Sequence, residues 1–550
     1  MIKRWNRSQI LLIICTIVIS VFIVMTWKVY PIVIDKDHFL EHSIRFSFRE
    51  DWKIWFITII FIWFIIKYLF AFVTKTSIEM ETGGISLKEQ KKLFWVSFGL
   101  NCLSWSCAFL LYFPGAAMND TINCMMSPVN ASGMQPLIFE MIVYWGLHIL
   151  GKLTGNMIFA YAILTFGQML FCAFAAAYAI TWIHRRKLKL FFCYCIAAFF
   201  AFSPIMADYS ITLVKDSCFA FFFLMLLIHT YDLISEKNIA MTNRKALKLA
   251  ILMILVTLFR SNAKVVTVFL LIALFVLKKI DRKKIVAIIL VIIGISKLNG
   301  AIVSYYNPES VAFREATGVL TQQMAAVIAR DGNIDKGELE FLEQILPIEQ
   351  WKSCYSFSLV DPIKFNADFD NHFLNDHKVE FLKTWFSLLR KNFKIYVDAY
   401  LFHTYQLWTV ASFDRSCVDY SQSIYTKINN NTEGDNIWSE YLTSVGLENR
   451  SVYPEIITKP LSDTFIKACE LSLIISPGWM VLILIICIFF SWIKRCRMEL
   501  IFLFSPLLMW IFFMVATPLA GPYRYSFYLL VALPFSIMVT WMEVNKRNSL

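Results

Sequence analysis

Charged residues, glycine and proline are scarce in this chain of 550 residues. Only 17% of the residues are Asp, Glu, Lys or Arg, and there are 18 Gly and 15 Pro. Soluble domains carry about 25% charged residues, so this composition excludes an ordinary water-soluble protein. The sequence also has no P-loop, no HExxH motif and no serine-hydrolase elbow, which excludes the enzyme classes that depend on them.

The 13 cysteines are scattered, with no CxxC motif and no cluster of Cys and His. A structural metal site is therefore not expected. The net charge of +12 is not accompanied by a pattern typical of nucleic-acid binding. We attribute the excess of Lys and Arg to loops that fix the orientation of a membrane protein.

Apolar residues make up 58% of the chain, and Phe alone occurs 50 times. Apolar runs close to 20 residues long predict transmembrane helices. The expected crossings, about twelve in number, are residues 10–30, 54–73, 94–113, 157–183, 190–207, 217–234, 247–259, 265–277, 285–303, 471–493, 500–515 and 525–541. The short runs 247–259 and 265–277 also fit a single kinked hairpin. The first run lacks a small-residue cleavage site, which favours a retained anchor over a signal peptide.

Basic residues predict the orientation. With the N-terminus in the cytoplasm, every loop expected on that side is basic, as is the C-terminal tail; these loops are 75–92, 184–187, 237–248, 278–284 and 494–497. The opposite side receives residues 112–136, 207–216, 260–264, 304–468 and 518–523. The positive-inside rule thus predicts a multi-pass protein of the cell membrane with both termini cytoplasmic.

Four units are expected. Residues 1–92 form an N-terminal addition of two helices, 93–303 a transmembrane core, 304–468 a mainly helical extracytoplasmic domain, and 469–550 the C-terminal transmembrane helices. The fold class is therefore all-α, a polytopic bundle with one helical domain outside the membrane.

The outer loops hold the residues that are candidates for chemistry. Asp120, beside Asn119, is the only acid between Glu89 and Glu140 and follows a Pro-Gly turn. A carboxylate at the lip of a bundle suits a general base or a cation ligand, and the alternative is a helix cap. A divalent cation is compatible with it, although the sequence leaves metal dependence open.

Cations recur on the same side of the membrane. Lys215 and Asp216 precede an apolar run, where Asp216 is either a helix cap or part of an outer cavity. Arg260 and Lys264 lie between two short apolar runs, in a recessed phosphate pocket or a plain turn.

The last outer turn contributes Arg524, which lies between Tyr523 and Tyr525. An Arg on the outer face runs against the positive-inside bias, and a planar guanidinium suits phosphate. One carboxylate and several cations are the groups needed to bind a lipid-linked phosphate donor and to activate an acceptor hydroxyl.

Several short motifs in a fixed order resemble the DUF6020 type of membrane protein, which in turn resembles the GT-C class of membrane glycosyltransferases. The motifs begin at residues 112 (YFPG), 119 (ND), 135 (QPL), 213 (LVKDS), 258 (LFRSN), 315 (EATG), 322 (QQMA), 361 (DPIK) and 521 (GPYRY). The resemblance implies a GT-C-like bundle with Asp120 as catalytic base. It also implies a polyprenyl-phosphate sugar donor and a glycan, lipid or protein acceptor. Relatives often carry His-Pro where this chain has Gln135-Pro136, which leaves an inactive scaffold as an alternative.

We therefore expect a glycosyltransferase that moves a sugar from a polyprenyl-phosphate donor to a cell-envelope glycan or lipid on the outer leaflet. Asp120 is the expected base, and Lys215, Arg260, Lys264 and Arg524 are the expected phosphate contacts. Asn119, Gln135, Asp216, Tyr523 and Tyr525 are further candidates on the same face. A flippase of lipid-linked sugars is the alternative from a different class, but it would need polar residues halfway across the bilayer.

Overall fold

The computed structural model describes residues 6–34, 40, 43–44, 48–76, 84–128, 136–236, 241–306, 312–410, 436–472, 476–516 and 523–548. Almost every described element is a helix. The two strands among these residues, β1 (Ala116–Ala117) and β2 (Thr212–Leu213), pair in parallel. The expectation of an all-α fold is confirmed.

Nine helices of the described residues are long and apolar enough to cross a membrane. They are α1 (Arg7–Ile34), α2 (Phe48–Lys75), α3 (Leu87–Leu111), α5 (Leu137–Thr154), α6 (Met157–Arg185), α9 (Lys215–Ser235), α12 (Arg282–Tyr306), α25 (Arg497–Ala516) and α26 (Phe527–Asn548). A tenth crossing results if α7 (Leu190–Phe202) and α8 (Pro204–Ile211), which are bent by 58° at their junction, are taken together. The chain is a polytopic membrane protein.

The number of crossings differs in detail from the sequence expectation. The helices α10 (Asn243–Phe259), α11 (Lys264–Val276) and α24 (Pro477–Ile493) occupy expected crossings but are short. In contrast, α5 was not expected as a crossing. It folds back on α6 as an antiparallel hairpin, in which Gly151 lies against Met157 and Gly146 against Leu164. Twelve crossings therefore stay a prediction.

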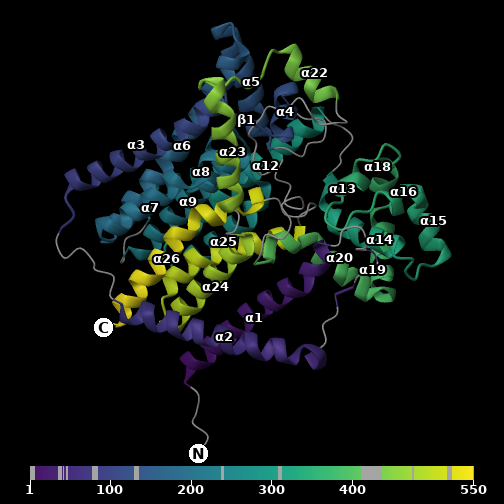
Figure 1. The fold of residues 1–550 in the computed structure, drawn as a ribbon, viewed down its shortest axis with the longest axis horizontal. Coiled ribbons are helices and arrows are strands. Elements are labelled where there is room, and N and C mark those ends of the chain that lie inside the picture. The colour runs from purple at the N-terminus through teal and green to yellow at the C-terminus, as the bar shows by residue number, and fades with distance from the viewer. Residues whose placement is uncertain are drawn as a thin grey trace, which may run out of the picture.

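The bundle is built around α9, which packs against α6, α10, α25 and α26. Most of its side chains are buried, including Phe223, Leu224 and Ile228. The opposite extreme is α12, in which Ile288 is the only buried residue and all others are partly or fully exposed. Apolar side chains that face outward need lipid around them, as a membrane protein requires. Figure 1 shows α6, α9, α25 and α26 in this bundle, with α1 and α2 along one edge of it.

A group of short helices forms a second body beside the bundle (Figure 1). Its elements are α13 (Ala312–Ala316), α14 (Gly318–Ala329), α15 (Lys336–Ile345), α16 (Ile348–Ser353), α17 (Asp361–Lys364), α18 (Asn371–Asp376) and α19 (Lys378–Lys391). They enclose a hydrophobic core of their own around Trp351, Phe381 and Leu388. This body, the helical domain below, occupies part of the region expected outside the membrane.

The next helix, α20 (Phe393–Trp408), joins the helical domain to the bundle. It packs on α14 at one end and on α24 and α1 at the other. Its C-terminal end meets α24 so closely that the Gly478 Cα lacks room for a side chain beside the Thr409 carbonyl. Most apolar residues of α20, such as Tyr396 and Phe402, are buried, whereas Phe393 at its start is exposed. Two later helices, α22 (Asn436–Ser444) and α23 (Glu455–Ser472), lie against α4 (Asn119–Met126) and α8 respectively.

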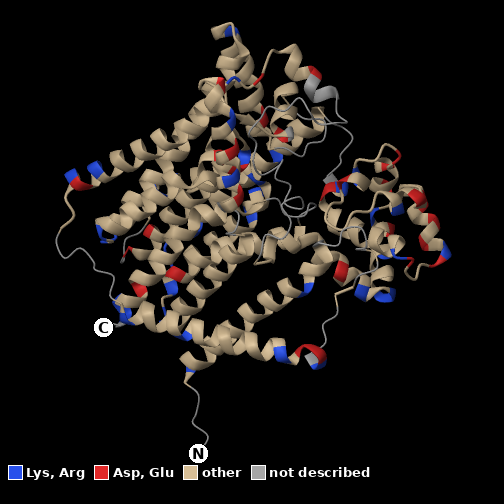
Figure 2. Ribbon diagram, viewed as in Figure 1, with Lys and Arg blue, Asp and Glu red and all other residues tan. Residues whose placement is uncertain are grey.

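Charged residues are distributed unevenly over this fold. Figure 2 shows long stretches of helix without charge, with blue and red segments at helix ends, over the helical domain and in one group near the centre of the view. Charge is costly inside a bilayer unless it is paired or hydrated. The central group is thus the part of the bundle that requires a chemical explanation.

Candidate functional site

The small parallel sheet brings two helix N-termini together. Ala116 pairs with Thr212 and Ala117 with Leu213. β1 leads into α4 (Asn119–Met126), and β2 leads into α9. Because the strands run parallel, α4 and α9 both begin at the same edge of the sheet. Asp120 and Lys215, in the first turns of these helices, are therefore neighbours although 95 positions separate them in the sequence.

Side chains from α6 fix this sheet. The Tyr161 hydroxyl donates to the Ala116 carbonyl at 2.7 Å, and the Gln168 amide donates to the Thr212 carbonyl at 2.6 Å. On α4, the Thr121 hydroxyl donates to the Leu213 carbonyl at 2.6 Å. Gly115 has a φ of 121°, and a Cβ there would lie 2.4 Å from Thr165 Cγ2. Only glycine fits such a close turn, which explains the Pro-Gly pair before the strand.

Asp120 lies between two cations. Its Oδ2 accepts from Arg524 Nη1 at 2.9 Å, and Lys215 Nζ lies 3.6 Å from the same oxygen. The Asp120 side chain keeps 25% exposure, whereas those of Lys215 and Arg524 keep 12% and 8%. Arg524 comes from η3 (Tyr523–Ser526), just before α26. The structure thus brings together three predicted residues from α4, α9 and η3, and leaves the carboxylate the most accessible of them.

Asp216 and Arg260 form a second, deeper ion pair. Asp216 Oδ1 accepts from Arg260 Nε at 2.6 Å and also from Nη2. The side chains are only 1% and 7% exposed. Asp216 lies in the first turn of α9, and its carboxylate satisfies a guanidinium from the end of α10. Arg260 is therefore directed at Asp216 in this structure.

Tyr525 connects the two ion pairs. Its ring lies under the Arg260 guanidinium, with the Arg260 Cζ 4.7 Å from the ring centroid, and the Arg524 Cζ lies 5.1 Å from the same centroid. Arg524 Nη2 also donates to the Tyr525 hydroxyl at 3.3 Å. Phe513 adds a second ring 5.1 Å from Arg260. Aromatic faces stabilise cations in such places, so the cluster of Asp120, Lys215, Asp216, Arg260, Arg524 and Tyr525, called the charged cluster below, is continuous.

The remaining predicted residues fall elsewhere. Lys264 is exposed at the start of α11, and no ion pair joins it to a described residue of the charged cluster. Tyr523 is buried, with its ring centroid 6.5 Å from that of Tyr209. Gln135 and the side chain of Asn119 lie outside the described residues.

The helical domain holds a further group of charged side chains, which the sequence shows only as motifs. Lys364, 1% exposed, lies 2.7 Å from a Glu315 oxygen and 3.2 Å from an Asp361 oxygen. Burial raises the pKa of the Asp361 carboxyl, and the Lys364 and Arg524 charges act against this rise. The influence of Arg524 places Asp361 within the electric field of the charged cluster.

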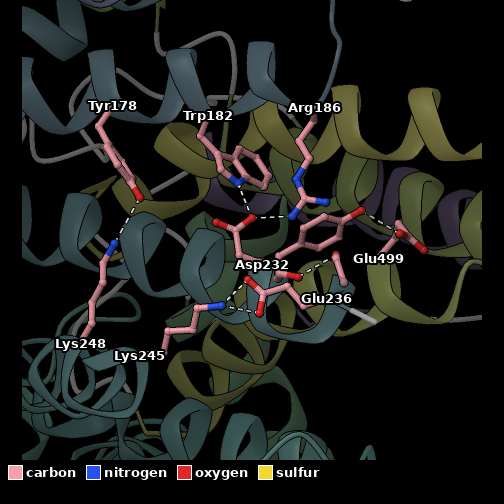
Figure 3. Close-up of polar contacts among 10 residues, drawn as sticks. Tyr178, Trp182, Arg186, Asp232, Glu236, Lys245, Lys248 and Glu499 are labelled. Carbon is pink, nitrogen blue, oxygen red and sulfur yellow. Dashed lines mark hydrogen bonds and ion pairs between the residues drawn. The ribbon is translucent and has the colours of Figure 1, made fainter. Parts of the chain in front are cut away.

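A different set of polar contacts lies at the other end of α9 (Figure 3). Trp182 Nε1 donates to Asp232 at 2.8 Å, and Arg186 also binds Asp232. Tyr231 donates to Glu499 at 2.8 Å, and Lys245 donates to Glu236 at 2.6 Å. Each acid has a partner from another helix. These contacts tie the helix ends together, and we assign them a structural role.

Metal ligands do not converge within the described part of the chain: no group of three or more His, Cys, Asp or Glu side chains occurs there. At Asp120 the neighbouring charges are positive. Two cations beside one carboxylate favour an anionic ligand over a metal ion.

Comparison with known protein families gives a match over most of the chain. Residues 135–549 match the model of a protein family of unknown function, DUF6020. The chain belongs to the DUF6020 family. Neither the curated proteins nor the solved structures give a match.

The DUF6020 match covers most but not all of the charged cluster. It includes Lys215, Asp216, Arg260, Arg524 and Tyr525. Asp120 lies before residue 135 and so precedes the matched region. In this DUF6020 protein the carboxylate reaches the site through the pairing of β1 with β2.

Proposed function

We propose that this DUF6020 protein is a membrane glycosyltransferase of the GT-C type. It would transfer a sugar from a polyprenyl-phosphate donor to a cell-envelope glycan or lipid at the outer leaflet. The observation that carries the proposal is the position of Asp120, which lies between Lys215 and Arg524 at the ends of membrane helices. A lipid-linked phosphate would meet cations there, at the level of its own head group.

The cations account for donor binding. Lys215 and Arg524 both contact Oδ2 of Asp120, and Arg524 offers a guanidinium fork that matches phosphate. The N-terminus of α9 adds partial positive charge on the same side. A bound phosphate would share these two cations with Asp120. Arg260, fixed by Asp216 and the aromatic rings, would act on the phosphate by its field from a deeper position.

The carboxylate accounts for the chemistry. The acceptor hydroxyl oxygen would form a bond to the anomeric carbon of the sugar while the bond from that carbon to the phosphate oxygen breaks. Asp120 would take the hydroxyl proton, and the polyprenyl phosphate would leave with the electron pair of the broken bond. Lys215 and Arg524 would stabilise the charge that develops on this leaving group.

The orientation forms part of the proposal. The charged cluster must face outward, with both chain termini in the cytoplasm, as the basic loops predict. A green fluorescent protein fused after Leu550 should then fluoresce, and an alkaline phosphatase fused there should be inactive. The reverse result would place the charged cluster on the cytoplasmic side and contradict the proposal.

The test of activity compares Asp120→Asn with a matched control. Membranes that contain each variant are supplied with radiolabelled polyprenyl-phosphate hexoses, and label entering envelope glycan and free polyprenyl phosphate are both measured. Asp120→Asn should lower transfer by about 100-fold or more, because general base catalysis contributes about that much. Asp331→Asn, whose side chain is 82% exposed in the helical domain, should transfer normally.

Two results would argue against the enzyme. Equal transfer by Asp120→Asn and the unsubstituted protein would remove Asp120 from the chemistry. Movement of intact donor across the membrane without release of polyprenyl phosphate would instead identify a transporter of lipid-linked sugars.

A further inference from the structure

A basic cavity lies at the end of the bundle away from the charged cluster. It has a volume of about 310 Å³ and is lined by Arg7, Trp492, Arg495, Arg497 and Leu500. These residues come from the start of α1, the end of α24, the turn that follows it and the start of α25. Ligand pockets in proteins have volumes of about 300–1,000 Å³, so the cavity has room for a small polar group.

The cavity and the charged cluster lie at the two ends of α25. Arg497 is the first residue of this helix, which ends at Ala516, shortly before Arg524. A helix of 20 residues is about 30 Å long, close to the thickness of the hydrocarbon core of a bilayer. The cavity therefore opens at the membrane surface opposite the charged cluster, and its ligand is independent of the proposed function.

The three guanidinium groups make no ion pair with any described acidic side chain. The acid nearest to Arg497 in sequence, Glu499, is 5% exposed and accepts a hydrogen bond from Tyr231 inside the bundle. Three like charges around one hollow repel each other unless an anion lies among them. Phosphate is the anion whose geometry matches the guanidinium fork.

Arg495 occupies a backbone position that glycine usually fills. It has a φ of 57° in the turn between α24 and α25, where its amide donates to the Trp492 carbonyl and the Cys496 amide to that of Ser491. Lys187 and Lys278 adopt similar conformations in two other turns at this face, so a basic residue there is not by itself a site. Arg495 differs from these lysines because it shares the cavity with Arg497 and with Arg7, which lies near the N-terminus.

We propose that this cavity binds the phosphate of an anionic phospholipid. The apolar part of the lining points to lipid as the source of the phosphate. Trp492 is 43% exposed, and Trp is typical of the level of lipid head groups. Basic pockets between membrane helices are known to take anionic head groups. The bound lipid would hold α1 against the hairpin of α24 and α25.

Native mass spectrometry of the purified full-length protein tests the proposal, with phosphatidylglycerol and phosphatidylcholine supplied in equal amounts. The unsubstituted protein should retain one phosphatidylglycerol in preference to phosphatidylcholine. The double variant Arg495→Gln, Arg497→Gln should bind phosphatidylglycerol about 25-fold more weakly, since each cation contributes about fivefold. The double variant Arg495→Lys, Arg497→Lys keeps both charges but loses the guanidinium forks. It should bind more tightly than the glutamine variant and more weakly than the unsubstituted protein, which separates loss of charge from misfolding.

The matched control removes two other exposed cations from the same face, Lys278→Gln and Lys283→Gln. Its phosphatidylglycerol binding should equal that of the unsubstituted protein. If this control lost as much phosphatidylglycerol binding as the Arg495→Gln, Arg497→Gln variant, the binding would depend on general surface charge, and the proposal would be overturned. Undiminished binding by the Arg495→Gln, Arg497→Gln variant would also overturn it. Displacement of the lipid by millimolar inorganic phosphate would show that free phosphate is the ligand and overturn the lipid assignment.

Discussion

Removing Arg260 alone should destabilise the protein strongly. Arg260→Met leaves the Asp216 carboxylate, which is 1% exposed, without its main cation. Breaking a buried ion pair on one side costs about 3–5 kcal/mol, because the remaining charge keeps its desolvation penalty. Asp216→Asn should cost less, about 1–3 kcal/mol, since Arg260 keeps the rings of Tyr525 and Phe513 at 4.7 and 5.1 Å.

The double variant Asp216→Leu, Arg260→Met separates pairing from general damage. It removes both charges, so it should be less destabilised than the sum of the single variants by about 2 kcal/mol or more. The free energy of unfolding is measured by titration with sodium dodecyl sulfate in mixed micelles. Two results would refute the assignment of a buried, coupled pair. One is a double variant whose loss of unfolding free energy equals the sum of the losses in the single variants. The other is an Arg260→Met protein whose unfolding free energy lies within about 1 kcal/mol of that of the unsubstituted protein.

Two further predictions concern the helical domain and its junction with the bundle. Although burial raises the pKa of Glu338, hydrogen bonds from Ser387, Lys391 and the Asp335 amide outweigh it, and the pKa is lowered. A lowered carboxyl pKa stabilises the folded state above the unfolded value of 4.5 and loses that effect as the pH falls through the folded value. Glu338→Gln should therefore speed hydrogen exchange in α15 at pH about 7, by about 1 kcal/mol of local stability. This effect should shrink as the pH falls below 4.5. An effect of constant size across this pH range would contradict the prediction. Gly478→Ala should lower the free energy of unfolding by about 1–3 kcal/mol, because its Cβ would lie 2.2 Å from the Thr409 carbonyl oxygen. The control is Gly294→Ala in α12, where the space around the glycine is open. In the titration with sodium dodecyl sulfate this control should be neutral or mildly stabilising.

The sequence predicts the helical bundle well because apolar length is a strong local signal. It misses α5 because Glu140, His148 and Lys152 interrupt the apolar run. In the fold Glu140 is 1% exposed, so burial that depends on tertiary contacts hides the charge. It does not indicate the bend of 58° at the start of α8, near the end of the expected crossing 190–207.

The candidate site shows the same limit. The sequence identifies Asp120, Lys215, Arg260 and Arg524 individually, through their charges beside apolar runs. Their partners follow from contacts between segments far apart in the chain, which no local pattern encodes. The parallel pairing of two-residue strands, the contact of Arg260 with Asp216 and the position of Tyr525 between two arginines are of this kind.

Glu315 and residues 361–364 belong to motifs that the sequence shows, but their contacts cannot be predicted from it. As motifs they are visible, but nothing local indicates that Lys364 is buried between Glu315 and Asp361. Their position near Arg524 depends on how the helical domain rests on the bundle.

The central claim is that Asp120 and a donor phosphate use the same two cations. Binding of a polyprenyl phosphate to the purified protein tests this most directly, with variants Arg524→Gln, Lys215→Gln and Asp120→Asn compared by calorimetry. The account predicts that each cation variant binds about 10-fold more weakly, whereas Asp120→Asn binds as well as the unsubstituted protein or better, because a competing carboxylate is gone. Weaker binding by Asp120→Asn, or unchanged binding by both cation variants, would contradict it.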